Sequence, residues 1–309
     1  MLRKELNLHP FYQKYTNVGG LPVLSSGNAS DAGLEEAARI VNKMLERRDD
    51  IRDALIRNHV RVVVMAPAEK TTDVPEHASL QPKEFWDDRA RGVGATPPRP
   101  VSSCGEENLL NLPGDRYARE NILIHEFAHT IHVMALNSID PSFDTRLRLA
   151  YQHAMTKGLW TNTYAATSHT EYWAETVQSY FDSNDANNKN HNDISTHDKL
   201  SGYDGEVFAL IDEVFRKSSW RYQRYDVRQG KKPPAEIRQV RLTIANKGHD
   251  EASIFWMSGT APKLYRKLAP GQSYDQVATS GQKWQAVQTS SGVTTNFVVP
   301  DGDGLWTLE

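Results

Sequence analysis

The feature that most constrains this chain is residues 116–137, RYARENILIHEFAHTIHVMALN, which contain neither glycine nor proline. These two residue types most often end helices, so a run of this length predicts a long helix with Asp115 as its N-cap. At 100° per residue, one side of this helix is apolar and faces away from His125, which predicts that the helix is mostly buried. The apolar side is made by Leu123, Phe127, Ile131 and Met134.

Two histidines of the predicted helix are four residues apart. His125 and His129 therefore project from one face, one turn apart, and both imidazoles can reach one ion. Zinc suits such ligands. Glu126, beside the first histidine, is placed to act as general base toward a metal-activated water. The His-Glu-x-x-His pattern also arises by chance, so a second feature has to support it.

A catalytic zinc site has a third protein ligand and leaves its fourth position for water. The segment EYWAETVQSYF is predicted to be helical, and in it Glu171 and Glu175 are four residues apart. Both carboxylates then point the same way. Glu171 can bind zinc, while Glu175 orients one of the ligating histidines by a hydrogen bond.

Other residues compete for these roles. His132 lies one turn beyond His129 on the same face and could be a ligand, a group that supports a ligand, or a buried core histidine. A metzincin would place its third histidine at position 135, which is alanine, so that class is disfavoured. His169 is a minor candidate for substrate contact, and Cys104 is interpreted as a small buried hydrophobe.

With these motifs in place, residues 115–181 resemble the gluzincin zinc peptidases, and more closely the lethal-factor-type peptidases. In that group a tyrosine stands seven positions before the glutamate ligand, and an aromatic residue, alanine and glutamate follow it. Tyr164 and the YWAE sequence after Glu171 match this register. The resemblance implies a Zn²⁺-dependent endopeptidase that hydrolyses peptide bonds, and it implies that Tyr164 stabilises the oxyanion by donating a hydrogen bond.

The rest of the chain predicts an α+β fold in two domains. Helices are expected over residues 34–57, over the segments FDTRLRLAYQHAMTK and GEVFALIDEVFRK, and a buried strand over residues 60–66. Residues 17–33 are expected to be a loop, and residues 105–112 a short strand. We therefore predict a zincin-like, mostly helical catalytic domain with a small sheet over residues 1–230, a linker over 231–238, and a small all-β sandwich over 239–309.

The tail, residues 240–308, resembles the β domain of the von Hippel-Lindau protein, which implies a similar fold. In that family a serine and two histidines read hydroxyproline on a partner peptide, and none of the three is present here, so the resemblance implies peptide or protein docking without that specificity. The matching aromatic and turn positions are Trp256, Tyr265, Leu268 to Gly271, and Trp284. The positions that correspond to the hydroxyproline-reading residues are Ala278, Val277 and Gln282.

The charge balance and the distribution of apolar residues limit the kinds of partner that we expect the protein to bind. The 36 Lys and Arg nearly balance the 39 Asp and Glu, and a net charge of -3 offers no field that would hold a nucleic acid. No apolar run is long enough to cross a bilayer, and the first residues lack the apolar core of a secretory leader. An Asn-Ala-Ser sequon at Asn28 favours an extracellular location, with a leader absent from this sequence. The expected partner is a peptide or protein substrate.

Two rival hypotheses remain at this stage. The first is a protein that keeps zinc without turnover and works through its β domain. The second is a zinc hydrolase of another amide or ester, since such a site polarises any carbonyl.

Overall fold

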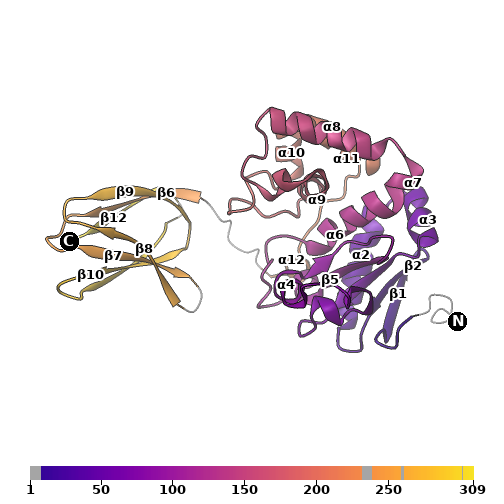
Figure 1. The fold of residues 1–309 in the computed structure, drawn as a ribbon, viewed down its shortest axis with the longest axis horizontal. Helices are drawn as coiled ribbons and strands as arrows, with labels where there is room; N and C mark the ends of the chain where they lie inside the picture. Colours follow the sequence, from indigo (N-terminus) through magenta and orange to yellow (C-terminus); the bar gives the residue numbers. More distant parts are fainter. Residues whose placement is uncertain (1–7, 232–238, 259–260, 301) are drawn as a thin grey trace. The chain divides into compact units, whose positions relative to one another are not determined.

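The computed structural model describes residues 8–231, 239–258, 261–300 and 302–309. The chain has an α+β fold, as the sequence predicts, and divides into two compact units, Met1–Pro233 and Pro234–Glu309 (Figure 1). The linker predicted over residues 231–238 lies, apart from its first residue, outside the described residues. Among the described residues no helix has the length and apolar character that a membrane span requires.

The first unit contains one five-stranded sheet in the order β1-β2-β3-β5-β4. β2, β3 and β5 are parallel to one another, and the outer strands β1 and β4 pair with their neighbours in the antiparallel direction. The strand predicted over residues 60–66 is confirmed as β3. The strands are β1 (Lys14–Val18), β2 (Leu21–Ser25), β3 (Arg61–Met65), β4 (Gly92–Val93) and β5 (Val101–Gly105).

Both faces of this sheet are covered by hydrophobic clusters. Alternate side chains of a strand point to opposite faces, so β3 contributes to both clusters. Val62 and Val64 belong to the main core, which the helices complete. Val63 and Met65 face a smaller cluster on the other side, together with Tyr12. This two-sided burial explains why β3 has three consecutive valines followed by methionine.

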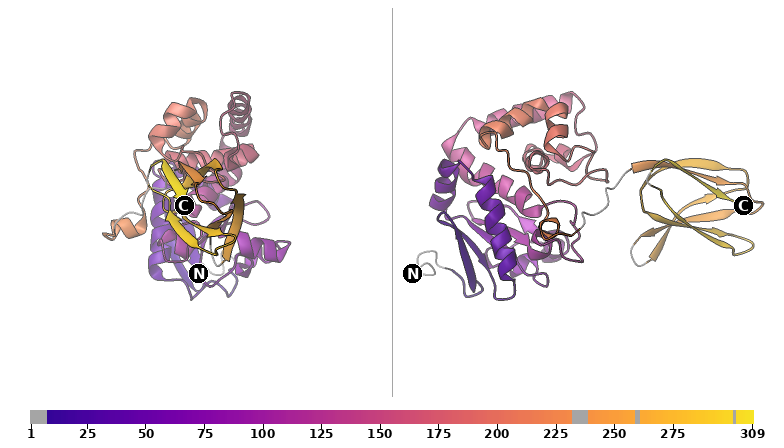
Figure 2. Two further views of the ribbon diagram at one scale, coloured as in Figure 1. Left: turned by 90° about the vertical axis from the view of Figure 1, so that its left-hand side faces the viewer. Right: turned by 180° about the vertical axis from the view of Figure 1, so that it is seen from behind.

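Helices α6 and α9 connect the sheet to the helical part of the first unit. α6 packs against β5 and against α9, and α9 in turn contacts α8, α10 and α11 (Figures 1 and 2). The helices are α2 (Asp31–Met44), α3 (Asp49–Arg57), α4 (Lys83–Arg89), α5 (Glu106–Leu109), α6 (Ile122–Ile131), α7 (Asn137–Ile139), α8 (Phe143–Thr156), α9 (His169–Tyr180), α10 (His197–Tyr203), α11 (Gly205–Val214) and α12 (Tyr225–Arg228). Single helical turns are η1 (Thr71–Asp73), η2 (Pro75–His77), η3 (His132–Leu136) and η4 (Tyr164–Thr167).

The helices predicted over residues 34–57 and at α8, α9 and α11 are confirmed. The start predicted for the helix over residues 116–137, with Asp115 as its N-cap, is wrong. α6 begins at Ile122, because Asn121 caps it by accepting a hydrogen bond from the Ile124 N–H at 3.0 Å. The Asp115 carboxylate instead accepts the Tyr117 N–H at 2.8 Å and closes a turn. The helix also widens after Ile131 into a π-helical turn, η3.

Two shorter expectations are also wrong. Residues 17–33 contain the buried strand β2, which the glycines and Pro22 obscured. Parallel pairing with β3 begins only at Val23, so Pro22 and its missing N–H do not interrupt that ladder. Residues 106–109 form the helix α5 and not a strand, with Gly105 as the N-terminal cap.

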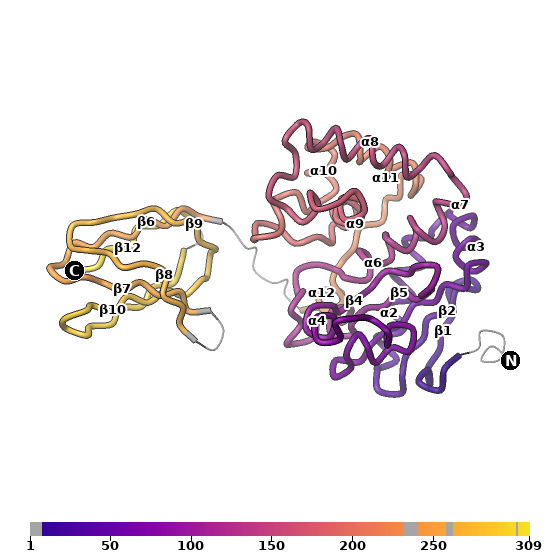
Figure 3. Tube along the Cα trace, viewed as in Figure 1, coloured from indigo at the N-terminus to yellow at the C-terminus, as the bar shows by residue number. Residues whose placement is uncertain are grey.

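The second unit consists of two sheets with a common hydrophobic core. Their strand orders are β11-β10-β7-β8 and β12-β6-β9, and Figure 3 traces the chain through them. Leu242 and Ile244 of one sheet and Ile254 and Trp284 of the other belong to this core. The four short strands predicted in the tail are confirmed within β6 (Gln239–Asn246), β7 (Ala252–Ser258), β10 (Lys283–Gln288) and β11 (Thr294–Val298). The remaining strands are β8 (Ala261–Leu268), β9 (Ser273–Thr279) and β12 (Gly304–Leu308).

Candidate metal centre

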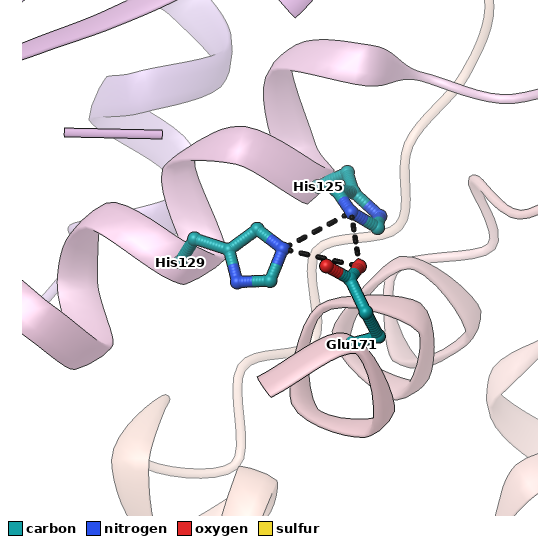
Figure 4. Close-up of side chains that lie close together, drawn as sticks. All are labelled: His125, His129 and Glu171. Carbon is teal, nitrogen blue, oxygen red and sulfur yellow. Dashed lines mark hydrogen bonds and ion pairs between the residues drawn. The ribbon is translucent and has the colours of Figure 1, made fainter. Parts of the chain in front are cut away.

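The packing of α6 against α9 brings three side chains together: His125 and His129 of α6 and Glu171 of α9 (Figure 4). Glu171 lies in the first turn of α9, where the Ser168 hydroxyl accepts a hydrogen bond from the Glu171 N–H at 3.1 Å. The cap therefore fixes the backbone from which this carboxylate projects. We call these three residues the metal triad.

The three donor atoms of the metal triad form an almost equilateral triangle. The two histidine Nε2 atoms are 3.2 Å apart, and Glu171 Oε2 lies 3.2 Å from His125 Nε2 and 3.3 Å from His129 Nε2. Ligand atoms at 2.0–2.1 Å from a tetrahedral zinc ion are separated by about 3.3–3.4 Å. The triad therefore has the dimensions of one face of a zinc coordination tetrahedron.

A hydrogen bond fixes the orientation of the His125 ring. Its Nδ1 lies 2.8 Å from Gln178 Oε1, and the amide is oriented because Gln178 Nε2 donates to the Asn121 carbonyl. An amide oxygen only accepts, so Nδ1 carries a proton, and Nε2 is the nitrogen of the metal triad at which a metal ion would take the place of a proton. This is the tautomer that a metal ligand requires.

The charges around the metal triad favour a cation. Burial alone would lower the pKa of His125, but the hydrogen bond to Glu171 and the carboxylates of Glu126 and Glu175 raise it to about 10. Burial opposes ionisation of Glu171, yet the two histidines hold the pKa of this carboxyl well below its usual range. The His129 and Glu171 side chains remain 17% and 22% exposed, so an ion and a ligand can reach the triad.

Glu126 lies beside the metal triad, against the edge strand β4. Burial raises the pKa of this carboxyl, and a hydrogen bond from the Gly94 backbone opposes the rise. The chain passes so close to α6 that a Cβ atom on Gly94 would lie 2.9 Å from the His129 Cβ, and one on Gly92 would lie 2.8 Å from the Glu126 Cγ. Glycine at these positions thus allows the edge of the sheet at β4 to approach the site.

Tyr164 also reaches this region, from the turn η4. Its ring lies nearly parallel to that of His125, with centroids 6.5 Å apart, and the side chain is partly exposed. Burial raises the pKa of the phenol, so the hydroxyl keeps its proton and remains a donor. The backbone N–H of Tyr164 donates to the Asn190 carbonyl at 2.7 Å, which anchors the turn.

Glu175 of α9 also approaches the His125 ring, which the sequence predicts it to orient, but Gln178 makes the closer contact. Glu175 Oε1 is 3.5 Å from His125 Nδ1, whereas Gln178 makes the shorter contact of 2.8 Å. Its Oε2 is turned toward His191 and Asn184. The sequence reasoning missed Gln178, although its place seven residues after Glu171 puts it on the same side of α9.

The remaining candidates do not join the metal triad. His132 is 2% exposed, and its Nε2 lies 3.0 Å from Asp144 Oδ1 of α8. His169 lies 3.3 Å from the same carboxylate oxygen. Cys104 is fully buried in β5, and burial raises the pKa of its thiol. Of the alternatives left open for His132, the geometry therefore favours a buried histidine that joins α8 to η3, the turn that follows α6.

No protein-family model matches the chain, and no curated protein matches it. Its function therefore has to be argued from its own residues.

Proposed function

We propose that this protein is a zinc-dependent endopeptidase. The observation that carries the proposal is the triangle of His125, His129 and Glu171, whose sides of 3.2–3.3 Å suit a tetrahedral zinc ion. Zinc bound there supplies a Lewis acid that polarises a carbonyl and makes water acidic enough to lose a proton near neutral pH. Three protein ligands leave one position for the reactants, which is the arrangement of catalytic zinc sites.

Glu126 acts as the general base in this proposal. Its carboxylate lies beside the metal triad, and its raised pKa brings it nearer to the pH at which it must accept and return a proton. It takes a proton from the attacking water and then gives that proton to the leaving amine. Tyr164, protonated and beside His125, donates a hydrogen bond to the oxyanion that develops on the scissile carbonyl.

The edge strand β4 gives the substrate a place to bind. It lies at one edge of the sheet, where Gly92 of β4 packs against Glu126 and Gly94, just after the strand, packs against His129. An extended peptide can add to such an edge through backbone hydrogen bonds, without strong demands on its sequence. This favours a peptide over another amide or an ester as the substrate.

We carry the two resemblances forward as part of this proposal. Residues 115–181 are assigned to the lethal-factor-type gluzincins, which accounts for Tyr164, Glu171 and Glu175 together. Residues 240–308 are assigned a fold like the von Hippel-Lindau β domain, with a docking role for a protein or peptide. In the tail Trp284 is 3% exposed and Tyr265 is 46% exposed, so Trp284 serves the core and Tyr265 is available at the surface.

The proposal is tested by the substitution Glu126→Gln, which removes the base but leaves the metal triad intact. Wild type and variant are incubated with a mixed peptide library, and the products are identified by mass spectrometry. We expect the variant to keep one zinc ion at the triad and to lose at least about 100-fold in cleavage rate. Glu35→Gln, an exposed change on α2, serves as the control.

The outcomes separate the rival functions. Cleavage by Glu126→Gln at the wild-type rate contradicts the assigned base. A wild type that holds zinc but cleaves no peptide contradicts the peptidase and favours a zinc-keeping binding protein, or a hydrolase of another amide or ester.

A further inference from the structure

A second group of potential metal ligands lies behind the metal triad. It consists of Glu120, in the turn before α6, Glu175 on α9, and His191, in the segment between α9 and α10. One donor atom from each of the three lies within 4.8 Å of the others. We call this group the Glu120 cluster.

His191 presents a lone pair to the two carboxylates. Its Nδ1 lies 3.0 Å from Asn188 Oδ1, and this amide oxygen is identified because Asn188 Nδ2 donates to Asp185. Nδ1 therefore carries the ring proton in the neutral imidazole, and Nε2 does not. Nε2 lies 3.1 Å from Glu175 Oε2, an ion pair only if the ring is protonated, and it makes no hydrogen bond within the described part of the chain.

A lone pair that faces a carboxylate at this distance is repulsive unless a positive charge lies between them. Burial alone would lower the pKa of His191, but Glu175 raises it, so that charge is either a ring proton or a metal ion. The histidine side chain is only 9% exposed and that of Glu175 only 3%, so bulk water screens the contact weakly. Burial raises the pKa of Glu120 to about 7, with the nearby charge of Glu175 adding to the rise. The cluster thus holds two carboxyl groups and one imidazole in a space that favours a cation or an extra proton.

We propose that the Glu120 cluster is a second metal site, which takes a divalent first-row cation of the zinc type. One imidazole nitrogen and two carboxylate oxygens suit such an ion, whereas calcium requires six to eight oxygen ligands. Each carboxylate keeps an outer hydrogen bond, from Asn184 Nδ2 to Glu175 Oε2 at 3.1 Å and from Gln178 Nε2 to Glu120 Oε2 at 3.3 Å. Such bonds orient ligating carboxylates.

This second ion would fasten the segment between α9 and α10 onto α9. His191 and Asn190 are neighbours in that segment, and the Asn190 carbonyl holds the Tyr164 backbone. Glu175 contributes to both centres, with Oε2 toward His191 and Oε1 3.5 Å from His125 Nδ1. The metal site stands independently of the proposed peptidase, and only its effect on Tyr164 rests on that function.

The test counts zinc ions per chain by native mass spectrometry of the full chain after saturation with zinc and removal of the excess. We expect two ions in wild type, one in Glu120→Gln/His191→Ala, and one in His129→Ala/Glu171→Gln. His153→Ala removes an exposed histidine on α8 that pairs with Glu206, and it should leave both ions in place.

Wild type with a single zinc ion, lost in His129→Ala/Glu171→Gln, overturns the second site whether or not any variant folds. A second ion that survives Glu120→Gln/His191→Ala or disappears in His153→Ala is a surface ion, and this also overturns it. These results do not depend on cleavage, so the second site can fail while the peptidase stands, and the peptidase can fail while two zinc ions remain.

Discussion

At the scale of single residues, the position of one proton decides whether His125 can bind a metal. The imidazole is useful only if Nδ1 holds the proton, and Gln178 Oε1 enforces this at 2.8 Å. The amide itself is oriented because its Nε2 donates to the Asn121 carbonyl, which belongs to the residue that caps α6. The helix cap and the histidine tautomer are thus joined through one glutamine.

Gln178→Met keeps the length of the side chain but removes the acceptor. We expect zinc affinity at the metal triad to fall by about 10- to 100-fold, because the His125 ring loses the bond that orients it. Competition with a chromophoric chelator measures the affinity. Gln152→Met, on the exposed side of α8, is the matched control, and equal affinities in the two variants would contradict the role of Gln178.

A second residue-scale prediction concerns His77, which is fully buried and lies 3.1 Å from the Ser103 hydroxyl. Burial lowers its pKa to about 4, while an unfolded histidine titrates near about 6.5. Between these values the unfolded state binds the proton first, so stability falls as the pH falls from 6.5 toward 4. His77 should contribute about 2 kcal/mol of this loss between pH 7 and pH 5.

The measurement is the free energy of urea unfolding as a function of pH in wild type and in His77→Gln. The variant should show a shallower loss over this range, because its side chain does not titrate. His153→Gln, an exposed change, should keep the wild-type slope. Parallel curves for wild type and His77→Gln would contradict the assignment.

At the scale of elements, periodicity within a helix could be predicted, while the meeting of helices could not. His125 and His129 share a face of α6 for a reason that is local to the sequence. The place of Glu171 needed a resemblance as well, because nothing in its own segment says that α9 packs on α6. Gln178 and His191 were missed for the same reason, since their partners lie on other elements and only tertiary packing brings them together.

The first residue of α6 could not be predicted from the sequence either. Asp115 and Asn121 are both good capping residues, and the run between them lacks glycine and proline. The side chain of Asp115 closes its own turn through the Tyr117 N–H, so the helix begins at the second capping residue. Propensity alone does not decide between two competing caps.

The cap of α9 yields the prediction for this scale. Ser168→Ala removes the oxygen that accepts the Glu171 N–H, so the first turn of the helix loosens at the residue that binds metal. We expect a loss of about 1 kcal/mol in the free energy of unfolding and weaker zinc binding. Ser168→Asp keeps an acceptor and should restore both, as measured by urea unfolding and chelator competition. Unchanged zinc affinity in Ser168→Ala would contradict the coupling of cap and ligand.

At the scale of the whole molecule, the described hydrophobic clusters each lie within one unit. The two clusters of the first unit draw on residues 8–225, and the cluster of the second on residues 240–308. All residues of the metal triad, of the Glu120 cluster and of the edge strand β4 belong to the first unit. Metal binding should therefore require nothing from the second unit.

We therefore expect residues 1–233 and 234–309 to fold as separate fragments. The first should bind zinc with the stoichiometry and affinity of the full chain, because every proposed ligand is present. The second should unfold cooperatively, with buried Trp284 and Trp306 reporting the transition by fluorescence. Its core is small, and a domain of this size has a correspondingly small margin of stability.

A 234–309 fragment without a cooperative transition, or a 1–233 fragment that loses zinc, would mean that the two units depend on each other. If both fragments behave as expected but only the full chain cleaves a protein substrate, the second unit contributes by docking that substrate, and short peptides should be cleaved equally well by residues 1–233.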